Sequence, residues 1–434
     1  MKNNRKQKIR EEKPTMQSKK FTYHWVIVIA CFLLMASSIG ITTNCFNLFT
    51  VEIMNDLGYT ASQVQLMASI ATIMMLVGSL IIGPLMKKFS MRVIMPIFGV
   101  IISLSFFLYS RCNSLTTLYI LSFFVGLGRS GVSVIPCGVL MNNWFQEKRG
   151  LATGIALAGS TGGGFVFVRI AKVIIASVGW RSAYMILGAT AAIIIIPVSL
   201  FLIRENPADK GLLPLGADSA LQAAPAAKEE PKPAAKGISR NQFLKTPAFW
   251  MLGILFFMIS VVNMGVQSNI SIYLSSQGHE RAFIADVVSI VLLAQVPGKI
   301  ILGQVYDKKG IKFGAVYCCV VYIVSIVALL LSANATMAIV FGVVVGLVLS
   351  MTTVTPPLVT SYAVGKREYS SIYGLLNAFA TAGVAAGPVI ASAIFDSTGS
   401  YNTAWYIFAV LAVVIVFITI FAMKKSEGFS EMTD

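Results

Sequence analysis

Four cations lie within long apolar runs of the sequence: Arg129, Arg169, Lys172 and Lys299. A charged side chain at the bilayer centre costs about 2.5 to 3.5 kcal/mol on insertion scales, so such cations usually face a partner, a cavity or a substrate. The acidic residues fall near the ends of these runs or in the segments between them. The sequence therefore predicts a positive site without an acidic partner, which an anion would neutralise.

Two of these cations lie in the fifth apolar run, where "GGGFVFVRIAKVI" places Arg169 shortly after three glycines. A guanidinium suits bidentate binding of a carboxylate, so Arg169 is a candidate substrate ligand. The alternative is an arginine bonded to neighbouring backbone carbonyls. Lys172 follows by one turn, and its long side chain is expected to extend toward the outer membrane interface.

The other two cations also have a functional and a structural interpretation. Arg129, in "GLGRSGVS", is central in its run, where it could face a cavity or bond to backbone within a tightly packed helix pair. Lys299, in "LLAQVPGKIILGQVYDKKG", could bind an anion or extend its stem toward the nearer membrane face.

Uncharged polar side chains in the runs are weaker candidates. Asn44 ends "TTN" in the first run, and Asn263 lies in the seventh. "SMTTVTPPLVTSY" places several hydroxyls before two prolines, which are expected to bend the tenth run. Such residues could line a cavity or join helices by hydrogen bonds.

The elements that must position these residues are membrane helices. The chain has 434 residues, of which 56% are hydrophobic and 12% charged, whereas a soluble domain carries about 25% charged residues. About 20 apolar residues cross the hydrocarbon core as a helix. We predict an all-α membrane protein with twelve transmembrane helices in two six-helix bundles. The predicted spans are 24–48, 61–86, 93–111, 115–142, 149–178, 181–204, 248–276, 282–306, 312–333, 336–362, 370–396 and 401–423.

The distribution of charge argues against nucleic acid as a partner and indicates an orientation. The net charge is +16, but 27 of the 34 Lys and Arg residues fall in the tails and alternate loops on one side of the predicted spans. By the positive-inside rule, both termini and the central loop are expected in the cytoplasm, with the protein in the cell membrane.

Enzyme and metal chemistry find no support in the sequence. The six cysteines lie in or at the ends of predicted helices without metal-ligand spacing, and the two histidines lie near opposite membrane faces. We expect no catalytic site, no metal and no cofactor.

The two halves of the chain are related by duplication. "GPLMKKFSMRV" from Gly83 and "GQVYDKKGIKF" from Gly303 are basic turns 220 residues apart. The same offset pairs "GIALAGSTGGGF" with "GLLNAFATAGVA". Parallel repeats are typical of secondary transporters. We predict a basic tail at 1–20, a first bundle at 21–204, a flexible linker at 205–247, a second bundle at 248–424 and a tail at 425–434.

These turns resemble those of the major facilitator superfamily, which carry G-x-x-x-D-x-x-G-x-[KR] after the second and eighth helices. The second copy fits with Gly303, Asp307, Gly310 and Lys312, and the resemblance implies a gating role for these residues and for Gly83. The first copy departs, since it has Lys87 in place of the acid and Ser90 in place of the second glycine.

"NNWFQEKRGLATGIALAGSTGGG" and "RENPADKGLLPLGAD" more narrowly resemble the oxalate:formate antiporter and monocarboxylate transporter branch. That branch has a basic residue eight positions before the motif acid, which makes Lys299 a carboxylate ligand. Proton-coupled members have an acid where this chain has Gln295, so the substitution favours exchange. Oxalate:formate exchangers have a lysine in the eleventh helix, where this chain reads "NAFAT" from Asn377, which argues against oxalate as the substrate. Gln295 and Asn377 are themselves candidate substrate-binding residues.

The resemblance implies a monomeric carrier of a mono- or dicarboxylate that works by exchange. A proton-coupled monocarboxylate symporter and a non-transporting membrane sensor with a carrier fold remain the alternatives.

Overall fold

The structure is a computed structural model that describes residues 23–217 and 236–432. The predicted basic tail at 1–20 and the middle of the predicted linker lie outside the described residues. In the described part, helices account for every long element, and the β-structure consists of two isolated bridges, Phe145 with Leu215 and Gly237 with Gly365.

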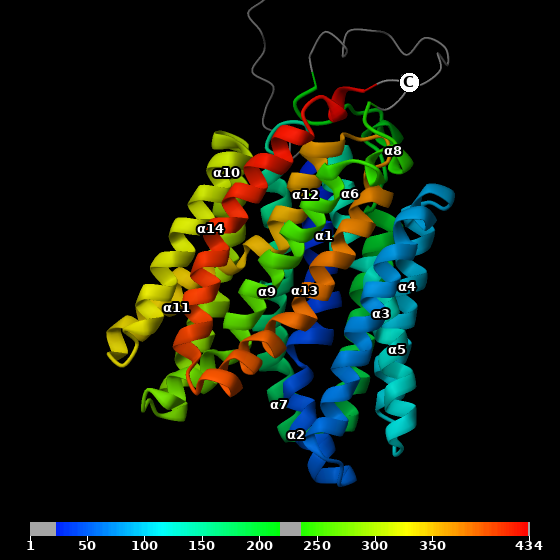
Figure 1. The fold of residues 1–434 in the computed structure, drawn as a ribbon. Helices are drawn as coiled ribbons and strands as arrows, with labels where there is room; N and C mark the ends of the chain where they lie inside the picture. Colours follow the sequence, from blue (N-terminus) through cyan, green and yellow to red (C-terminus); the bar gives the residue numbers. More distant parts are fainter. Residues whose placement is uncertain (1–22, 218–235, 433–434) are drawn as a thin grey trace, which may run out of the picture.

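The first half of the chain forms one bundle, which is coloured blue to green in Figure 1. Its first span is continuous through three helical segments, α1, η1 and α2, and its fourth span is divided between α5 and α6. The bounds are α1 (Tyr23–Met35), π-helical η1 (Ala36–Asn44), α2 (Phe46–Leu57), α3 (Ala61–Lys88), α4 (Met91–Tyr109), α5 (Leu115–Val132), α6 (Val134–Trp144), α7 (Arg149–Pro197) and η2 (Val198–Leu202).

The second half repeats this arrangement after the linker segment that contains α8. The tenth predicted span is divided between α11 and α12, as the fourth is between α5 and α6. The bounds are α8 (Arg240–Leu244), α9 (Pro247–Ser276), α10 (Arg281–Leu330), α11 (Ala335–Leu349), α12 (Met351–Val364), α13 (Tyr369–Thr398) and α14 (Tyr401–Lys425).

Two long elements each contain two spans. Helices α7 and α10 have 49 and 50 residues, which at about 1.5 Å per residue is more than twice the roughly 30 Å of the hydrocarbon core. Gly179 (φ 79°, ψ 165°) interrupts α7, and Gly310 (φ 79°, ψ 175°) interrupts α10. The ten apolar helical segments found in the described residues therefore correspond to twelve spans, as the sequence predicts.

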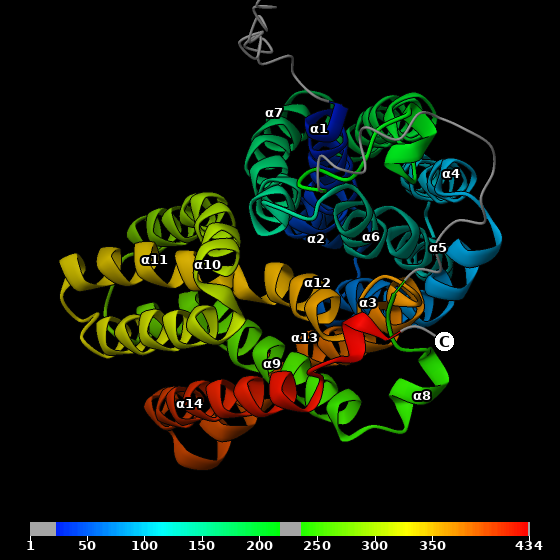
Figure 2. The same ribbon diagram turned by 90° about the horizontal axis from the view of Figure 1, so that it is seen from above.

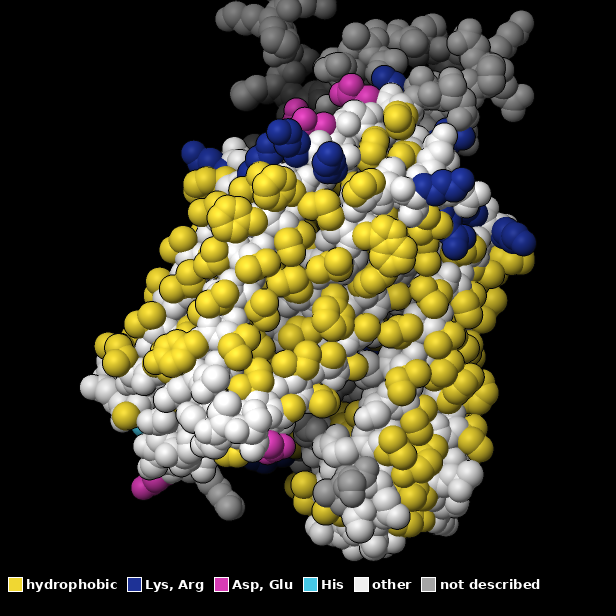
Figure 3. Space-filling model, viewed as in Figure 1, with side chains coloured by type: hydrophobic (Ala, Val, Ile, Leu, Met, Phe, Trp, Pro, Cys, Tyr) yellow, Lys and Arg dark blue, Asp and Glu magenta, His cyan; other side chains and the backbone are white. Residues whose placement is uncertain are grey.

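The surface is that of a membrane protein. Apolar side chains point outward along the helices, among them Ile193, Phe201, Val173 and Val389. On the face shown in Figure 3, hydrophobic side chains cover the sides, while Lys and Arg gather at one end. We call this the basic end; it holds Lys87, Lys308, Lys366, Lys424 and their neighbours. A bilayer would shield the apolar sides, because a monomeric soluble protein rarely exposes so large an apolar area.

The bundles meet along two pairs of helices. Helix α7 of the first bundle packs on α10 of the second, and α3 packs on α13. Figure 2 shows α3 beside α13 between the two halves. Glycines allow these close approaches, because a Cβ at Gly154 would lie 2.3 Å from the Lys299 carbonyl oxygen and one at Gly374 would lie 2.5 Å from that of Ser79.

Candidate functional site

A cavity of about 610 Å³ lies between the bundles. It reaches from Asn377 toward Gln65, which lies near the start of α3 and so near the end opposite the basic end. Its lining comes from η1, α2, α3, α4, α5, α6 and α7 of the first bundle and from α9, α12 and α13 of the second. A site built by both halves is where an alternating-access carrier would hold its substrate.

Arg129 carries the only charge among the described residues that line this cavity. The glycines around it do pack tightly, since a Cβ at Gly126 would lie 2.2 Å from the Ala71 carbonyl oxygen of α3. Backbone bonding of the guanidinium, the alternative interpretation, is not what the structure shows: Arg129 Nε is buried and finds no hydrogen-bond partner in the described part of the chain. An unpaired buried donor of a cation is costly, so a ligand acceptor would stabilise it.

The wall formed by η1 is an irregular helix. Within it, the hydroxyls of Ser37, Ser38 and Thr42 donate to backbone carbonyls three or four residues earlier instead of to other helices. Such bonds compete with the regular helical ladder, and π-helical turns often occur at functional sites. Thr42 and Thr43 thereby reach the cavity lining.

Lys299 lies on α10 at the contact between the bundles and is 2% exposed. Its Nζ donates to three acceptors of α7: Ser160 Oγ at 2.7 Å, Thr161 Oγ1 at 2.7 Å and the Leu157 carbonyl oxygen at 3.1 Å. Thr161 in turn donates to Gln295 Oε1 at 3.5 Å. An ammonium has three donors, so Lys299 has none left for a ligand in this conformation. The side chain spans the bundles rather than extending to the membrane surface.

A matching contact closes the other helix pair. Asn377 of α13 donates to Ser79 Oγ of α3 at 3.2 Å, and Asn377 also lines the cavity. Ser79 and Lys299 are 220 residues apart, the offset of the repeat. Of these two contacts, only the one made by Asn377 borders the cavity; Lys299 and its three acceptors lie outside the lining.

The predicted gating motif lies closer to the basic end than Lys299 and also joins the bundles. Asp307 accepts hydrogen bonds from the backbone N–H groups of Gly150 at 2.6 Å and Leu151 at 2.8 Å, in the first turn of α7. A carboxylate is stabilised there by the free N–H groups and the helix dipole. The helices nearly touch here, because a Cβ at Gly303 would lie 2.0 Å from the Gly150 carbonyl oxygen.

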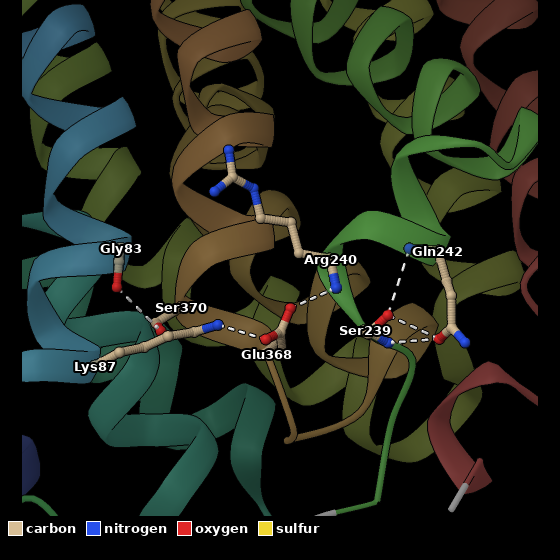
Figure 4. Close-up of polar contacts among 7 residues, drawn as sticks. All are labelled: Gly83, Lys87, Ser239, Arg240, Gln242, Glu368 and Ser370. Carbon is tan, nitrogen blue, oxygen red and sulfur yellow. Dashed lines mark hydrogen bonds and ion pairs between the residues drawn. The ribbon is translucent and has the colours of Figure 1, made fainter. Parts of the chain in front are cut away.

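The first copy of the motif closes the other helix pair with the opposite charge, as Figure 4 shows. Lys87 Nζ of α3 forms an ion pair with Glu368 at 2.7 Å, and Glu368 also accepts from the Arg240 N–H at the start of α8. Burial would raise the pKa of Glu368, but the hydrogen bonds from Lys87 and the Arg240 N–H bring the pKa below its usual value. The linker is thus attached to the same carboxylate.

Sequence reasoning missed this ion pair, although a signal was present. The offset of 220 relates Lys87 to Asp307 and Lys148 to Glu368. At both repeat positions the first half therefore has a lysine where the second half has an acid. Gly83 does lie at this contact: a Cβ there would be 2.5 Å from the Ser370 carbonyl oxygen.

Three further candidates from the sequence, in the first bundle, do not line the cavity. Arg169 is exposed on α7 and does not line the cavity. Its guanidinium lies 3.5 Å from the centre of the Phe165 ring and donates to the Phe165 carbonyl oxygen at 3.4 Å, as the alternative interpretation has it. Lys172 is also exposed. Asn44 donates to the Ser160 carbonyl oxygen at 3.0 Å within the first bundle.

Two further candidates make contacts within the second bundle. Asn263 donates to Thr352 Oγ1 at 2.8 Å, and Thr352 lines the cavity. Lys312 lies 4.0 Å from Glu427 in a solvent-exposed pair. Gly310 supplies the left-handed turn between the eighth and ninth spans, whereas Ser90 in the first copy caps α4 with its hydroxyl.

Comparison with known proteins agrees with the fold. The chain is 26% identical over 406 residues to monocarboxylate transporter 12 of Xenopus laevis, covering 88% of this chain and 84% of the relative. It is 25% identical over 289 residues to the oxalate:formate antiporter of Oxalobacter formigenes, covering 66% and 64%.

Solved structures share the architecture at low identity. The proton:xylose symporter XylE superposes with a TM-score of 0.71 at 13% identity, covering 94% of this chain and 98% of that one. The human organic anion transporter MFSD10 gives 0.64 at 12% identity, covering 91% and 99%. The family description "Major Facilitator Superfamily" matches residues 30–377 and 278–431. The chain, a multi-pass membrane transporter by its relatives and its helices, belongs to the Major Facilitator Superfamily.

Proposed function

We propose that the protein carries a small organic anion with one carboxylate across the membrane by alternating access. The observation that carries this proposal is the unpaired guanidinium of Arg129, the sole charge in the described cavity lining. In the described conformation the lining offers one cation for one carboxylate, which favours a monocarboxylate over a dicarboxylate. Two relatives are named for small carboxylates: the monocarboxylate transporter, and the oxalate:formate antiporter, whose name gives one dicarboxylate and one monocarboxylate.

Exchange fits the site better than proton coupling. A proton-coupled carrier needs a group that titrates beside the substrate, and the described lining holds no Asp or Glu. Gln295, at the position of the expected acid, is neutral and bonded to Thr161. An empty cavity with an uncompensated cation resists closure, whereas an occupied one is neutral. Return of the carrier is therefore expected to require a second anion.

We place the basic end in the cytoplasm, because Lys and Arg mark cytoplasmic loops. The described conformation is then outward-facing, with its cytoplasmic side closed by the Asp307 and Lys87 contacts. In the inward-facing state α7 and α10 would separate at this side, and the ammonium of Lys299 would lose its three acceptors. Lys299 then becomes available to the anion. We expect the carrier to act as a monomer in the cell membrane.

The test is counterflow of labelled monocarboxylates in proteoliposomes. Wild-type protein should take up label only when the vesicles contain unlabelled anion, and Arg129→Gln should lose uptake at least tenfold, with Arg129→Lys retaining part of it. Equal uptake into empty vesicles would contradict exchange. Accumulation driven by a pH gradient alone would establish symport, and binding without flux would establish a sensor.

A further inference from the structure

The cavity has two chemically different ends. On α5, Ser122, Val125 and Arg129 all line it, at the spacing of one helical face. Seven residues separate Ser122 from Arg129, which corresponds to about 10 Å along a helix. Arg129 is the charged end, and the region beside Ser122 is the other end.

The end beside Ser122 is aromatic. Tyr184 stacks on Phe49 with ring centroids 3.8 Å apart, and it contacts Tyr109 at 4.9 Å and Phe106 at 5.4 Å. All four residues line the cavity, although each is at most 5% exposed. The Tyr109 hydroxyl lies 2.7 Å from Ser122 Oγ, so the hydroxyl has a protein partner. The ring cluster therefore offers a fixed apolar wall.

The facing walls carry adaptable apolar side chains among uncharged polar ones such as Thr72 and Ser268. Helix α3 contributes Met67 and Met75, and α9 contributes Met264. Methionine side chains adjust to the shape of an apolar group and favour contact with aromatic rings. On α13 the lining includes Ala385, which is exposed to the cavity.

The size of the cavity exceeds what a small anion needs. Ligand sites of about 300 to 1,000 Å³ hold molecules of drug size, and this cavity of about 610 Å³ falls in that range. One water occupies about 30 Å³ in the liquid, so a two-carbon anion would leave most of the space to water against apolar walls. A larger apolar tail would displace that water favourably.

We propose that the preferred substrate is a monocarboxylate with an aryl tail, whose carboxylate binds Arg129 while its ring reaches toward the Phe49, Phe106, Tyr109 and Tyr184 cluster. This inference rests on the proposed function, because Arg129 is taken as the carboxylate ligand. It specifies the substrate further, as a molecule whose ring is separated by several bonds from its carboxylate. Such a substrate should be preferred to formate, acetate, lactate or oxalate.

The test compares uptake of labelled 4-phenylbutyrate and labelled acetate into proteoliposomes loaded with the same unlabelled anion. A competition series of phenylacetate, 3-phenylpropionate and 4-phenylbutyrate varies the distance between the carboxylate and the ring. We expect 4-phenylbutyrate to compete at a concentration at least tenfold lower than acetate, and affinity to rise along the series. Neutral 4-phenylbutyramide should not compete.

A substitution that enlarges one lining side chain tests where the aryl tail of the substrate binds. Ala385→Phe narrows the apolar part of the cavity and should weaken the apparent affinity for 4-phenylbutyrate at least fivefold relative to that for acetate. Ala393→Phe, on the same helix but outside the lining, is the matched control and should leave this ratio unchanged.

The outcomes separate the two proposals. If acetate or lactate competes as well as the aryl series, or if Ala385→Phe leaves the ratio unchanged, the aryl inference is wrong and the anion carrier stands. If no carboxylate of either kind is exchanged, both are wrong.

Discussion

Lys299 Nζ lies 2.7 Å from Thr161 Oγ1, and this hydrogen bond joins α10 of the second bundle to α7 of the first. The same hydroxyl donates onward to Gln295 Oε1. A buried ammonium is thus held by neutral oxygens of the opposite bundle rather than by an acid. Its hydrogen bonds exist only while the two bundles are closed at the basic end, so they contribute to the choice between conformations.

We expect Thr161→Val to reduce the population closed at the basic end by about tenfold, because a buried donor left without its acceptor costs about 1 to 3 kcal/mol. The population can be measured by the distance between spin labels at Phe89 and Lys309, both exposed, in a background without the six native cysteines. Thr381→Val is the control at the equivalent repeat position, since Thr381 bonds only to the Asn377 carbonyl oxygen of its own helix. An equal shift in both variants would refute a special role for the Lys299 contact.

Close helix approach should be equally necessary for this conformation. Gly154→Ala places a methyl group 2.3 Å from the Lys299 carbonyl oxygen, so α7 and α10 must separate, and overpacking of this kind costs about 1 to 3 kcal/mol. Gly162→Ala, two turns along the same helix, meets its nearest neighbour at 3.6 Å and should be tolerated. The same spin-label pair should lengthen in Gly154→Ala and remain as in wild type in Gly162→Ala.

The population closed at the basic end should change when the charges of Lys87 and Glu368 are reversed. Lys87→Glu places two carboxylates together and should lower the closed population up to about fivefold, since partly exposed pairs contribute about 0.2 to 1 kcal/mol. The double variant Lys87→Glu with Glu368→Lys restores attraction but leaves the Arg240 N–H without its acceptor, so recovery should be incomplete. Lys88→Glu, on the next residue, is the control. Recovery that is absent at low salt would show that the pair does not act as an ion pair.

The stability of the folded protein should depend on pH through the amine of Lys366. Burial, and then the charge of Arg149 on the other bundle, lower the pKa of Lys366 from 10.5 to about 8. In the folded protein the amine therefore loses its proton above about pH 8, while the unfolded chain keeps it to about 10.5. Stability consequently rises with pH through this window, because the unfolded state binds more protons there. The melting temperature of wild type relative to Lys366→Met should increase between pH 7.5 and 9.5, and a constant difference would refute the shift.

The sequence predicts the architecture well because bilayer thickness and charge sorting leave few choices. The predicted boundaries between spans include Gly179 in α7 and Gly310 in α10. At both glycines the chain turns with a positive φ, which favours glycine. The first span was predicted to end at residue 48, whereas the helix continues to Leu57.

The site was harder to predict because depth along a helix does not determine which way a side chain faces. The sequence favoured Arg169 as a substrate ligand over Arg129, yet Arg129 lines the cavity and Arg169 stacks on Phe165. Lys299 was expected to bind a carboxylate or to extend toward the nearer membrane face. Its three hydrogen bonds to α7 depend instead on the register between helices, which no local pattern encodes.

The exchanged charges of Lys87 and Asp307 also limit how the duplicated gene could have diverged. A chain made of two first halves would put a lysine against the amides that begin α7, where the helix dipole repels it. A chain made of two second halves would put an aspartate against Glu368. Neither symmetric chain would keep both closing contacts as they are now, since Lys87 needs the carboxylate of Glu368 whereas Asp307 needs only backbone N–H groups.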